Sequence, residues 1–222
     1  MNFLLIGIAL LVAFIDWFAV VRLNKPLEYA AKPGVMVLIL AWLVTIGGFR
    51  IPLLWFTLGI LFSMAGDICL MLQREQFIAG LVSFLLAHIF YIIGLSYKLP
   101  AFNPASLVLA VLVFLTASQI YLRLSAGLKR SANAKLLMPV LVYTLVISVM
   151  LFSALATLVR LDWNAGSAFL VSFGALLFFI SDSLLAWNKF VHSLRYGKLL
   201  VIVTYHIGQI LLALGAASHF LS

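Results

Sequence analysis

Charged residues and cysteine are both scarce in this sequence. Only 9% of its 222 residues are charged, with six acidic residues against 14 lysines and arginines. The single cysteine, Cys69, excludes an internal disulfide, and no CxxC or paired Cys/His pattern typical of a zinc site occurs. Because soluble domains usually contain about 25% charged residues, the low charge excludes an ordinary soluble domain.

Apolar residues are correspondingly abundant and make up 66% of the chain. This composition also excludes disorder. One membrane-spanning helix needs about 20 apolar residues, so the chain has room for roughly eight. We therefore predict an all-α polytopic membrane protein that forms a single integral membrane domain over residues 1–222. The apolar N-terminus has no basic n-region and no A-x-A cleavage site, so we predict a retained first helix.

Charged residues, proline and glycine divide the chain into eight apolar runs. Backbone polar groups inside lipid must be satisfied within their own segment, so we expect each run to be a helix. The second run is the shortest. The predicted spans are 3–21, 35–49, 53–72, 77–97, 105–122, 136–159, 166–187 and 199–220.

Basic residues concentrate in alternate loops of this arrangement. Three of them, Arg50, Lys98 and Arg160, lie in the even-numbered loops. The odd-numbered loops hold the other eleven, namely Arg22, Lys25, Lys32, Arg74, Arg123, Lys129, Arg130, Lys135, Lys189, Arg195 and Lys198. The positive-inside rule then places the odd loops on the cytoplasmic side of a cell membrane and both termini outside. The net charge of +8 accordingly indicates loops beside anionic lipid and no nucleic-acid partner.

Two segments half a chain apart resemble each other. LGILFSMAGDICLM surrounds Asp67 and FGALLFFISDSLLA surrounds Asp182, with a glycine eight residues before each aspartate. A His-Ile pair follows in the next run in each case, at His88 and at His206. The pattern predicts two four-helix repeats of parallel topology.

Ionisable residues occur inside several predicted spans, where each costs about 2.5–3.5 kcal/mol on insertion scales. Residues of this kind normally face the bundle interior and mark a functional site. They are Asp16, Asp67, His88, Asp182 and His206, accompanied by Tyr91, Tyr143, Tyr205 and Gln209.

These polar residues are predicted to share the cytoplasmic half of the membrane. At 1.5 Å per residue, the three aspartates lie about 8 Å from the cytoplasmic ends of their spans. Helical spacing puts Ser63 on the face of Asp67. Lys32 and Pro33 stand just before the second span, at the cytoplasmic side. We expect a polar cavity that opens toward the cytoplasmic leaflet, with Lys32 contacting a phosphate at its mouth.

The order and spacing of these residues resemble the YhhN/TMEM86 family of eight-helix membrane proteins, whose characterised members are lysoplasmalogenases. The resemblance covers nearly the whole chain. Its segments are Lys32-Pro33, GDICLML, FIAGLVSFLLAHIFY, Pro139 with Tyr143, GALLFFISDSLLAWNKF, and Tyr205 with Gln209. The family often has a small residue where His206 stands, so this histidine departs from the pattern.

The resemblance implies hydrolysis of the vinyl-ether bond of a lysoplasmalogen to a fatty aldehyde and a glycerophospho-ethanolamine or -choline. Two carboxyls in a low-dielectric cavity suit this chemistry, because burial and mutual repulsion keep one protonated while the other stays ionised. We assign catalysis to Asp67 and Asp182, oriented by His88 and Tyr91. Substrate binding is assigned to Lys32, Ser63, Tyr143, Ser181, Tyr205 and Gln209. No metal, cofactor or obligate protein partner is expected; the partners are the lysophospholipid substrate and membrane lipids.

Two alternative functions fit part of the pattern. A metal-dependent lipid hydrolase could use Asp67, His88 and Asp182 or His206 as ligands, although no H-x-x-x-H or H-x-x-E-H spacing supports it. A small proton-coupled transporter would also have repeated halves and buried acids. A transport path requires polar groups in both leaflets, whereas those predicted here gather in one.

Overall fold

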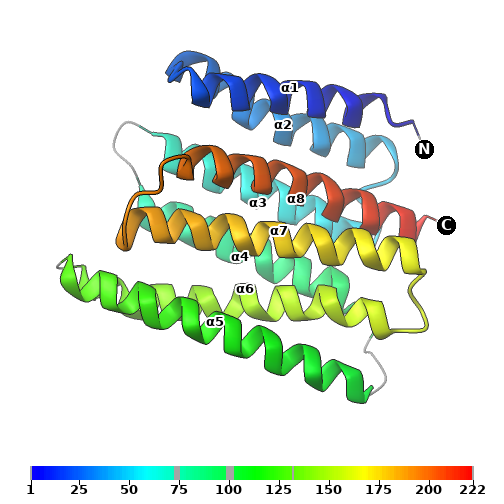
Figure 1. Ribbon diagram of the computed structural model, residues 1–222. Coiled ribbons are helices and arrows are strands. Elements are labelled where there is room, and N and C mark those ends of the chain that lie inside the picture. Colours follow the sequence, from blue (N-terminus) through cyan, green and yellow to red (C-terminus); the bar gives the residue numbers. More distant parts are fainter. Residues whose placement is uncertain (1, 73–75, 99–102, 132, 222) are drawn as a thin grey trace.

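The computed structural model describes residues 2–72, 76–98, 103–131 and 133–221 (Figure 1). It confirms an all-α fold with eight helices long and apolar enough to cross a membrane, and the described residues contain no strand. One-turn 3₁₀ helices, η1 (Ala134–Leu136) and η2 (Thr157–Val159), flank α6. The long helices are α1 (Leu4–Val21), α2 (Lys25–Thr45), α3 (Leu53–Met71), α4 (Phe77–Leu95), α5 (Pro104–Arg130), α6 (Leu137–Ala156), α7 (Ala165–Phe190) and α8 (Gly197–Phe220).

Helix α2 differs most from its predicted span of 35–49. It begins at Lys25 because the Asn24 side chain accepts a hydrogen bond from the Leu27 N–H and caps the first turn. The prediction that Lys32 and Pro33 precede this helix is therefore wrong: both lie inside it. Charged residues in the first two turns shorten the apolar run and conceal the start of the helix.

Helices α5 and α7 also continue past their predicted ends, to Arg130 and Phe190. Basic side chains occupy the last turn of each, where they interact favourably with the negative end of the helix dipole. Several basic residues predicted in loops thus belong to helix ends. Arg74 lies outside the described residues.

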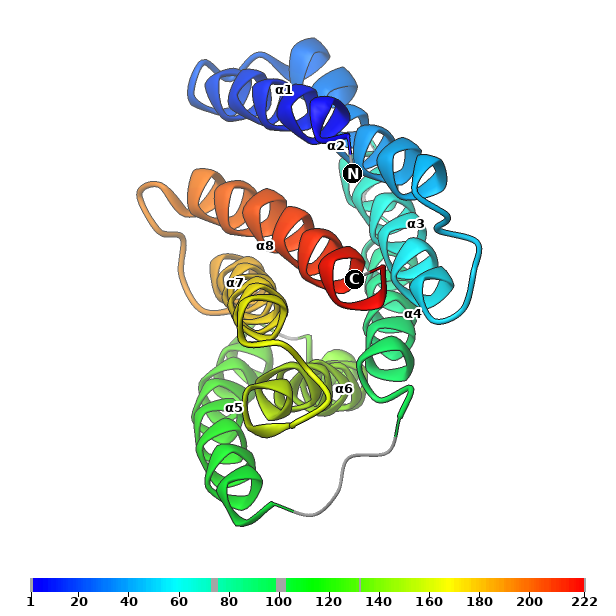
Figure 2. The ribbon, with the colours of Figure 1, turned by 90° about the vertical axis from the view of Figure 1, so that its right-hand side faces the viewer.

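The helices pack as four sequential pairs, α1 with α2, α3 with α4, α5 with α6 and α7 with α8 (Figure 2). Helix α8 contacts α7, α3, α1 and α2, whereas α5 lies at the edge of the bundle and is the least buried of the eight. Both termini lie at one end of the bundle (Figure 1). The last residues of α1, α3, α5 and α7 therefore lie at the opposite end, which is the end we predict to be cytoplasmic.

Glycines set the closest helix contacts. A Cβ at Gly174 of α7 would lie 2.8 Å from the carbonyl oxygen of Gly208 in α8, so neither position accepts a larger side chain. In α3, a Cβ at Gly59 would lie 2.3 Å from the Tyr91 ring and one at Gly66 would lie 2.6 Å from the Phe84 ring. Small residues of this kind let membrane helices approach closely, and here they also seat two aromatic rings of α4.

The proposed internal repeat stays a prediction. The two glycines that precede the aspartates by eight residues, Gly59 and Gly174, both stand at close helix contacts. Their neighbours differ, however, because Gly59 faces an aromatic ring and Gly174 faces backbone. Equivalent places in the sequence thus have different surroundings in the fold.

Candidate active site

The first carboxyl, Asp67 near the end of α3, is almost completely buried. Its Oδ1 lies 2.8 Å from the Nζ of Lys32 in α2. Its Oδ2 accepts a 2.6 Å hydrogen bond from the Tyr205 hydroxyl in α8. The Lys32 ammonium also lies 5.7 Å from the centre of the Tyr205 ring. We call Asp67, Lys32 and Tyr205 the Asp67 centre, an ion pair in which the ammonium stabilises the ionised carboxylate.

The second carboxyl, Asp182 in α7, has different neighbours. Its Oδ2 accepts a hydrogen bond from the Tyr143 hydroxyl of α6 and lies 3.2 Å from Nε2 of His88 in α4. The same histidine nitrogen lies 3.0 Å from the Tyr143 oxygen, so the three groups meet at one point. We call Asp182, Tyr143 and His88 the Asp182 centre. None of its three side chains carries a permanent charge, so a protonated carboxyl is compatible with all of them.

A third hydrogen-bonded group lies beside the two centres. The Tyr91 hydroxyl donates to Oε1 of Gln209 at 2.5 Å, and the Gln209 amide donates to the Ser63 hydroxyl at 3.0 Å. All three residues are buried. Tyr91 therefore bonds to the other helices of the site and not to an aspartate.

An aromatic ring, Phe178 of α7, joins the three groups. Its centroid lies 4.6 Å from the His88 ring, 5.5 Å from the Tyr205 ring and 6.3 Å from the Tyr91 ring. Asp67 and Asp182 interact electrostatically, although each has its own hydrogen-bond partners. The two centres are thus neighbours with an apolar ring packed between their side chains.

An apolar groove lined by α3, α4, α5, α6 and α7 lies next to the Asp182 centre. Asp182 and Tyr143 are part of its lining, and the groove has a cavity volume of about 50 Å³. Most of the wall is apolar, including Leu81, Ile120, Leu124, Ile147, Phe179 and Leu185. The groove has the chemistry of a site for an alkyl chain.

Nine of the ten predicted site residues thus belong to three neighbouring groups that six helices bring together. The tenth, Ser181, lies apart from them and donates a 3.0 Å hydrogen bond to the Val201 carbonyl of α8. The aspartates are also not equidistant from their helix ends. Asp67 lies four residues before the end of α3 and Asp182 eight before the end of α7, because α7 extends to Phe190.

Two aromatic residues that pack against these centres, Phe178 and Phe84, were not predicted as site residues from the sequence. Phe178 precedes Asp182 by four residues and Phe84 precedes His88 by four, so each shares a helix face with a polar site residue. That spacing is a usable signal. Among 18 phenylalanines it would have selected many packing residues as well.

A ligand set for the metal-dependent alternative is not found in the part of the chain that the structure describes. No three or more His, Cys, Asp or Glu side chains there come close enough together to hold a metal ion. His206, one of the ligands considered, lies outside both centres and hydrogen-bonds to no described residue. The residues present therefore form hydrogen-bonded pairs and triads and not a metal site.

Comparison with known proteins identifies the family. The YhhN family model matches residues 27–216, which is most of the chain and includes every residue of the two centres. The chain belongs to the YhhN family. It is 35% identical to mouse "Lysoplasmalogenase TMEM86B" over 187 residues, covering 83% of this chain and 72% of the mouse protein.

Further relatives have similar names. The chain is 32% identical to rat "Lysoplasmalogenase TMEM86B", over 83% of this chain and 70% of the rat protein. It is 33% identical to human "Lysoplasmalogenase TMEM86A", over 71% of this chain and 63% of the human protein. No solved structure matches significantly.

Proposed function

We propose that this YhhN-family protein is a multi-pass membrane enzyme of the lysoplasmalogenase type, which hydrolyses the vinyl-ether bond of lysoplasmalogens. The identity of 35% to mouse "Lysoplasmalogenase TMEM86B" over 83% of the chain supports the reaction class. The observation that carries the mechanism is the contrast between the two carboxyls. One is held beside a lysine, and the other has a tyrosine and a histidine as partners next to an apolar groove.

In this mechanism Asp182 is the acid. With the alkenyl chain in the groove, its carboxyl transfers a proton to the β-carbon of the vinyl ether and leaves an oxocarbenium ion. The tyrosine and histidine of the Asp182 centre hold the carboxyl in place and stabilise the carboxylate that remains after the transfer. Positioned general acids of this kind contribute about 10²- to 10⁴-fold in rate.

Asp67 is the base. Its carboxylate, kept ionised by Lys32, lies close enough to stabilise the cation and takes a proton from the water that attacks it. The product is a hemiacetal. As the hemiacetal collapses, its hydroxyl proton returns to Asp182 and the proton on Asp67 passes to the departing glycerol oxygen. Both carboxyls regain their starting forms, and one water is consumed.

The lipid reaches this site from within the membrane. The groove admits the chain laterally, and the headgroup stays at the end of the bundle remote from the termini. We place that end in the cytoplasm, with both termini outside, because it carries most of the basic residues. The Lys32 side chain is 15% exposed, so a contact with the headgroup phosphate remains part of the proposal.

Lipid mass spectrometry of the purified protein tests this function. Incubation with a lysoplasmalogen should release a fatty aldehyde and the glycerophospho-headgroup, whereas an ester lysophospholipid of equal chain length should stay intact. Asp67→Asn and Asp182→Asn should each abolish aldehyde release. Full activity in either variant contradicts the paired mechanism. Ion flux in liposomes without lipid turnover would instead support the transporter alternative.

A further inference from the structure

Two buried residues near the site have no protein partner. Asp16 of α1 and His206 of α8 are both fully buried. Neither carboxylate oxygen of Asp16 and neither ring nitrogen of His206 has a hydrogen-bond partner among the described residues. More than about 90% of such buried polar groups in folded proteins are hydrogen-bonded, to protein or to water. These four atoms therefore require a partner other than the chain itself.

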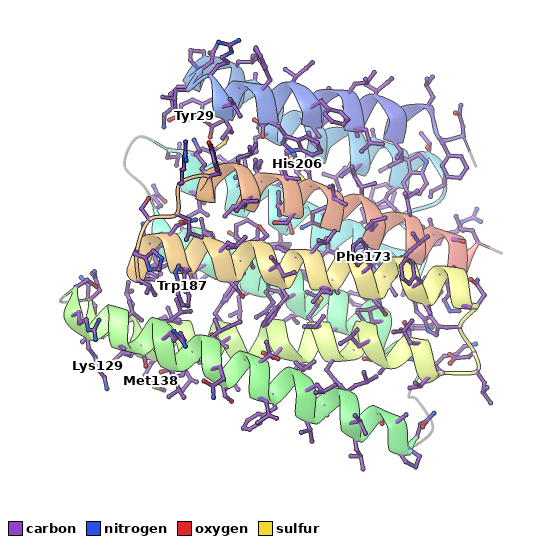
Figure 3. The ribbon with its side chains drawn as sticks, viewed as in Figure 1. Tyr29, Lys129, Met138, Phe173, Trp187 and His206 are labelled. Atoms are coloured by element: carbon purple, nitrogen blue, oxygen red, sulfur yellow. The ribbon has the colours of Figure 1, made fainter. Side chains whose placement is uncertain are left out.

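The two residues lie on the side of the Asp67 centre that faces away from the groove. Helix α1 packs against α2 and α8, and His206 lies where α8 faces these two helices (Figure 3). Lys32, the ion-pair partner of Asp67, interacts electrostatically with both Asp16 and His206. The groove, in contrast, is lined from α3 to α7, next to Asp182.

A water molecule matches the chemistry of these atoms. The charged neighbours of Asp16 are Lys32, Glu28, Asp67 and Lys198. Of these, Lys32 is paired with Asp67, and Lys198 is paired with Glu28 at 2.7 Å. Because both lysines are already paired with other carboxylates, the Asp16 carboxylate requires hydrogen bonds from uncharged donors. Water donates to carboxylates, both donates to and accepts from imidazole, and typically binds buried polar atoms in this way.

The proposed reaction also needs a source of water. A substrate chain in the groove closes the approach to Asp182, and an apolar wall does not bind water. The Lys198 side chain, in contrast, is 53% exposed, and the Glu28–Lys198 pair interacts electrostatically with Asp16, so the charged surroundings of Asp16 extend to the protein surface. We propose that Asp16 and His206 form a water-binding site that supplies the hydrolytic water to Asp67, on the opposite side of the centre from the lipid groove. This inference rests on the proposed function.

Thiol hydrogen–deuterium exchange tests the water site without reference to activity. In a Cys69→Ala background, a cysteine is placed at His206, or at Ala213, which is also buried and lies seven residues further along α8. The S–H to S–D change is then followed by infrared spectroscopy after transfer to D₂O. We expect exchange at least ten-fold faster in His206→Cys than in Ala213→Cys. Equal rates would overturn the proposal.

A pair of Asp16 variants tests the link to turnover. Asp16→Leu removes the group that binds water, whereas Asp16→Asn keeps a polar side chain of the same shape. We expect Asp16→Leu to lower kcat on the order of ten-fold, because the nucleophile loses its position, with an unchanged KM for the lysolipid. The melting temperature should not fall, because the leucine leaves no bare buried carboxyl. Asp16→Asn should recover most of the rate.

The two experiments separate the possible failures. A fall in melting temperature together with kcat in Asp16→Leu assigns Asp16 a structural role and contradicts the inference. If the wild-type protein releases no aldehyde, the proposed function fails. The exchange rates then still decide whether water occupies the site.

Discussion

The Asp67 and Asp182 centres lie side by side, yet the first has charged neighbours and the second has mostly apolar ones. Asp67 has a lysine ion pair, and further charged residues lie beyond it on α1, α2 and α8. Asp182 has only a tyrosine and a histidine, and its other surroundings are the apolar side chains of the groove. The contrast teaches that two identical side chains acquire different roles from their neighbours, one as an anion and one as a proton donor.

The largest expected effect is the loss of turnover when either aspartate is replaced, and recovery of activity with an added carboxylate distinguishes the two centres. Asp67→Asn and Asp182→Asn should each lose about 10²- to 10⁴-fold in turnover, the usual contribution of a positioned acid or base. Formate should restore part of the activity of an Asp67→Ala variant, since truncation leaves space for the added carboxylate and Lys32 remains to bind it. It should not restore Asp182→Ala, because the apolar groove excludes a small anion. The measurement is aldehyde release with increasing formate.

Formamide at the same concentration is the control for this rescue, because it matches formate in shape and carries no charge. Rescue of Asp182→Ala alone would reverse our assignment of acid and base. Rescue of both variants would show that the two centres are equally open to solvent.

The second prediction concerns stability. Lys32→Met leaves the buried Asp67 carboxylate without its counter-charge, and breaking a buried pair in this way costs about 3–5 kcal/mol. Tyr143→Phe removes only a hydrogen bond from Asp182, which costs about 1–3 kcal/mol because that carboxyl can remain neutral. Unfolding in mixed detergent micelles should rank the two variants in this order.

The double variant Lys32→Met/Asp67→Asn is the matched control. It removes both charges, so it should recover much of the stability that Lys32→Met loses. Additive losses would mean that the lysine stabilises the fold through packing and not through its charge.

The third prediction concerns the groove alone. Ala186→Phe adds a ring to its wall and should raise KM for a long-chain lysoplasmalogen about ten-fold, with a smaller effect on a short-chain one. The control Val111→Phe adds the same ring to an exposed, lipid-facing position of α5. Equal effects of Ala186→Phe on both chain lengths would show that the alkyl chain binds elsewhere.

The sequence predicts the fold well because lipid imposes one simple requirement. Every span must be apolar and helical, so hydropathy alone locates eight helices. The errors occur where polar residues belong to a helix. Lys25 and Glu28 in the first turn of α2 conceal its start, and as a consequence Lys32 was expected in a loop although it lies inside the helix, partly buried beside Asp67.

The sequence predicts which residues form the site better than it predicts how those residues are arranged. The cost of burying ionisable groups selects Asp67, Asp182 and His88 from the sequence alone. Their pairing is not visible there, because His88 of α4 contacts the aspartate of α7 and Tyr205 of α8 contacts the aspartate of α3. Such crossed contacts depend on how the helices dock. The groove depends on the same docking, since its wall consists of ordinary apolar residues from several helices.

Asp162 provides an exposed counterpart to the buried carboxyls of the two centres, and its removal should have the smallest effect. It lies in the loop before α7, where Arg160 donates to its two oxygens at 2.9 and 2.7 Å. The same arginine donates to the Leu95 carbonyl at 2.9 Å and so ties this loop to the end of α4. These hydrogen bonds lower the pKa of Asp162 below its ordinary value. Asp162→Asn should cost at most about 1 kcal/mol, because solvent screens an exposed pair.

The pH dependence of this pair has a definite sign. A carboxyl whose pKa is lower in the folded state contributes stability above its unfolded value of about 3.9 and loses it as the pH falls toward the folded value. The melting temperatures of wild type and Asp162→Asn should therefore differ at pH 7 and converge below about pH 4. A difference that persists in acid would come from the loop conformation and not from the charge. Aldehyde release at pH 7 should be the same in both, since Asp162 lies at the opposite end of α7 from the Asp182 centre.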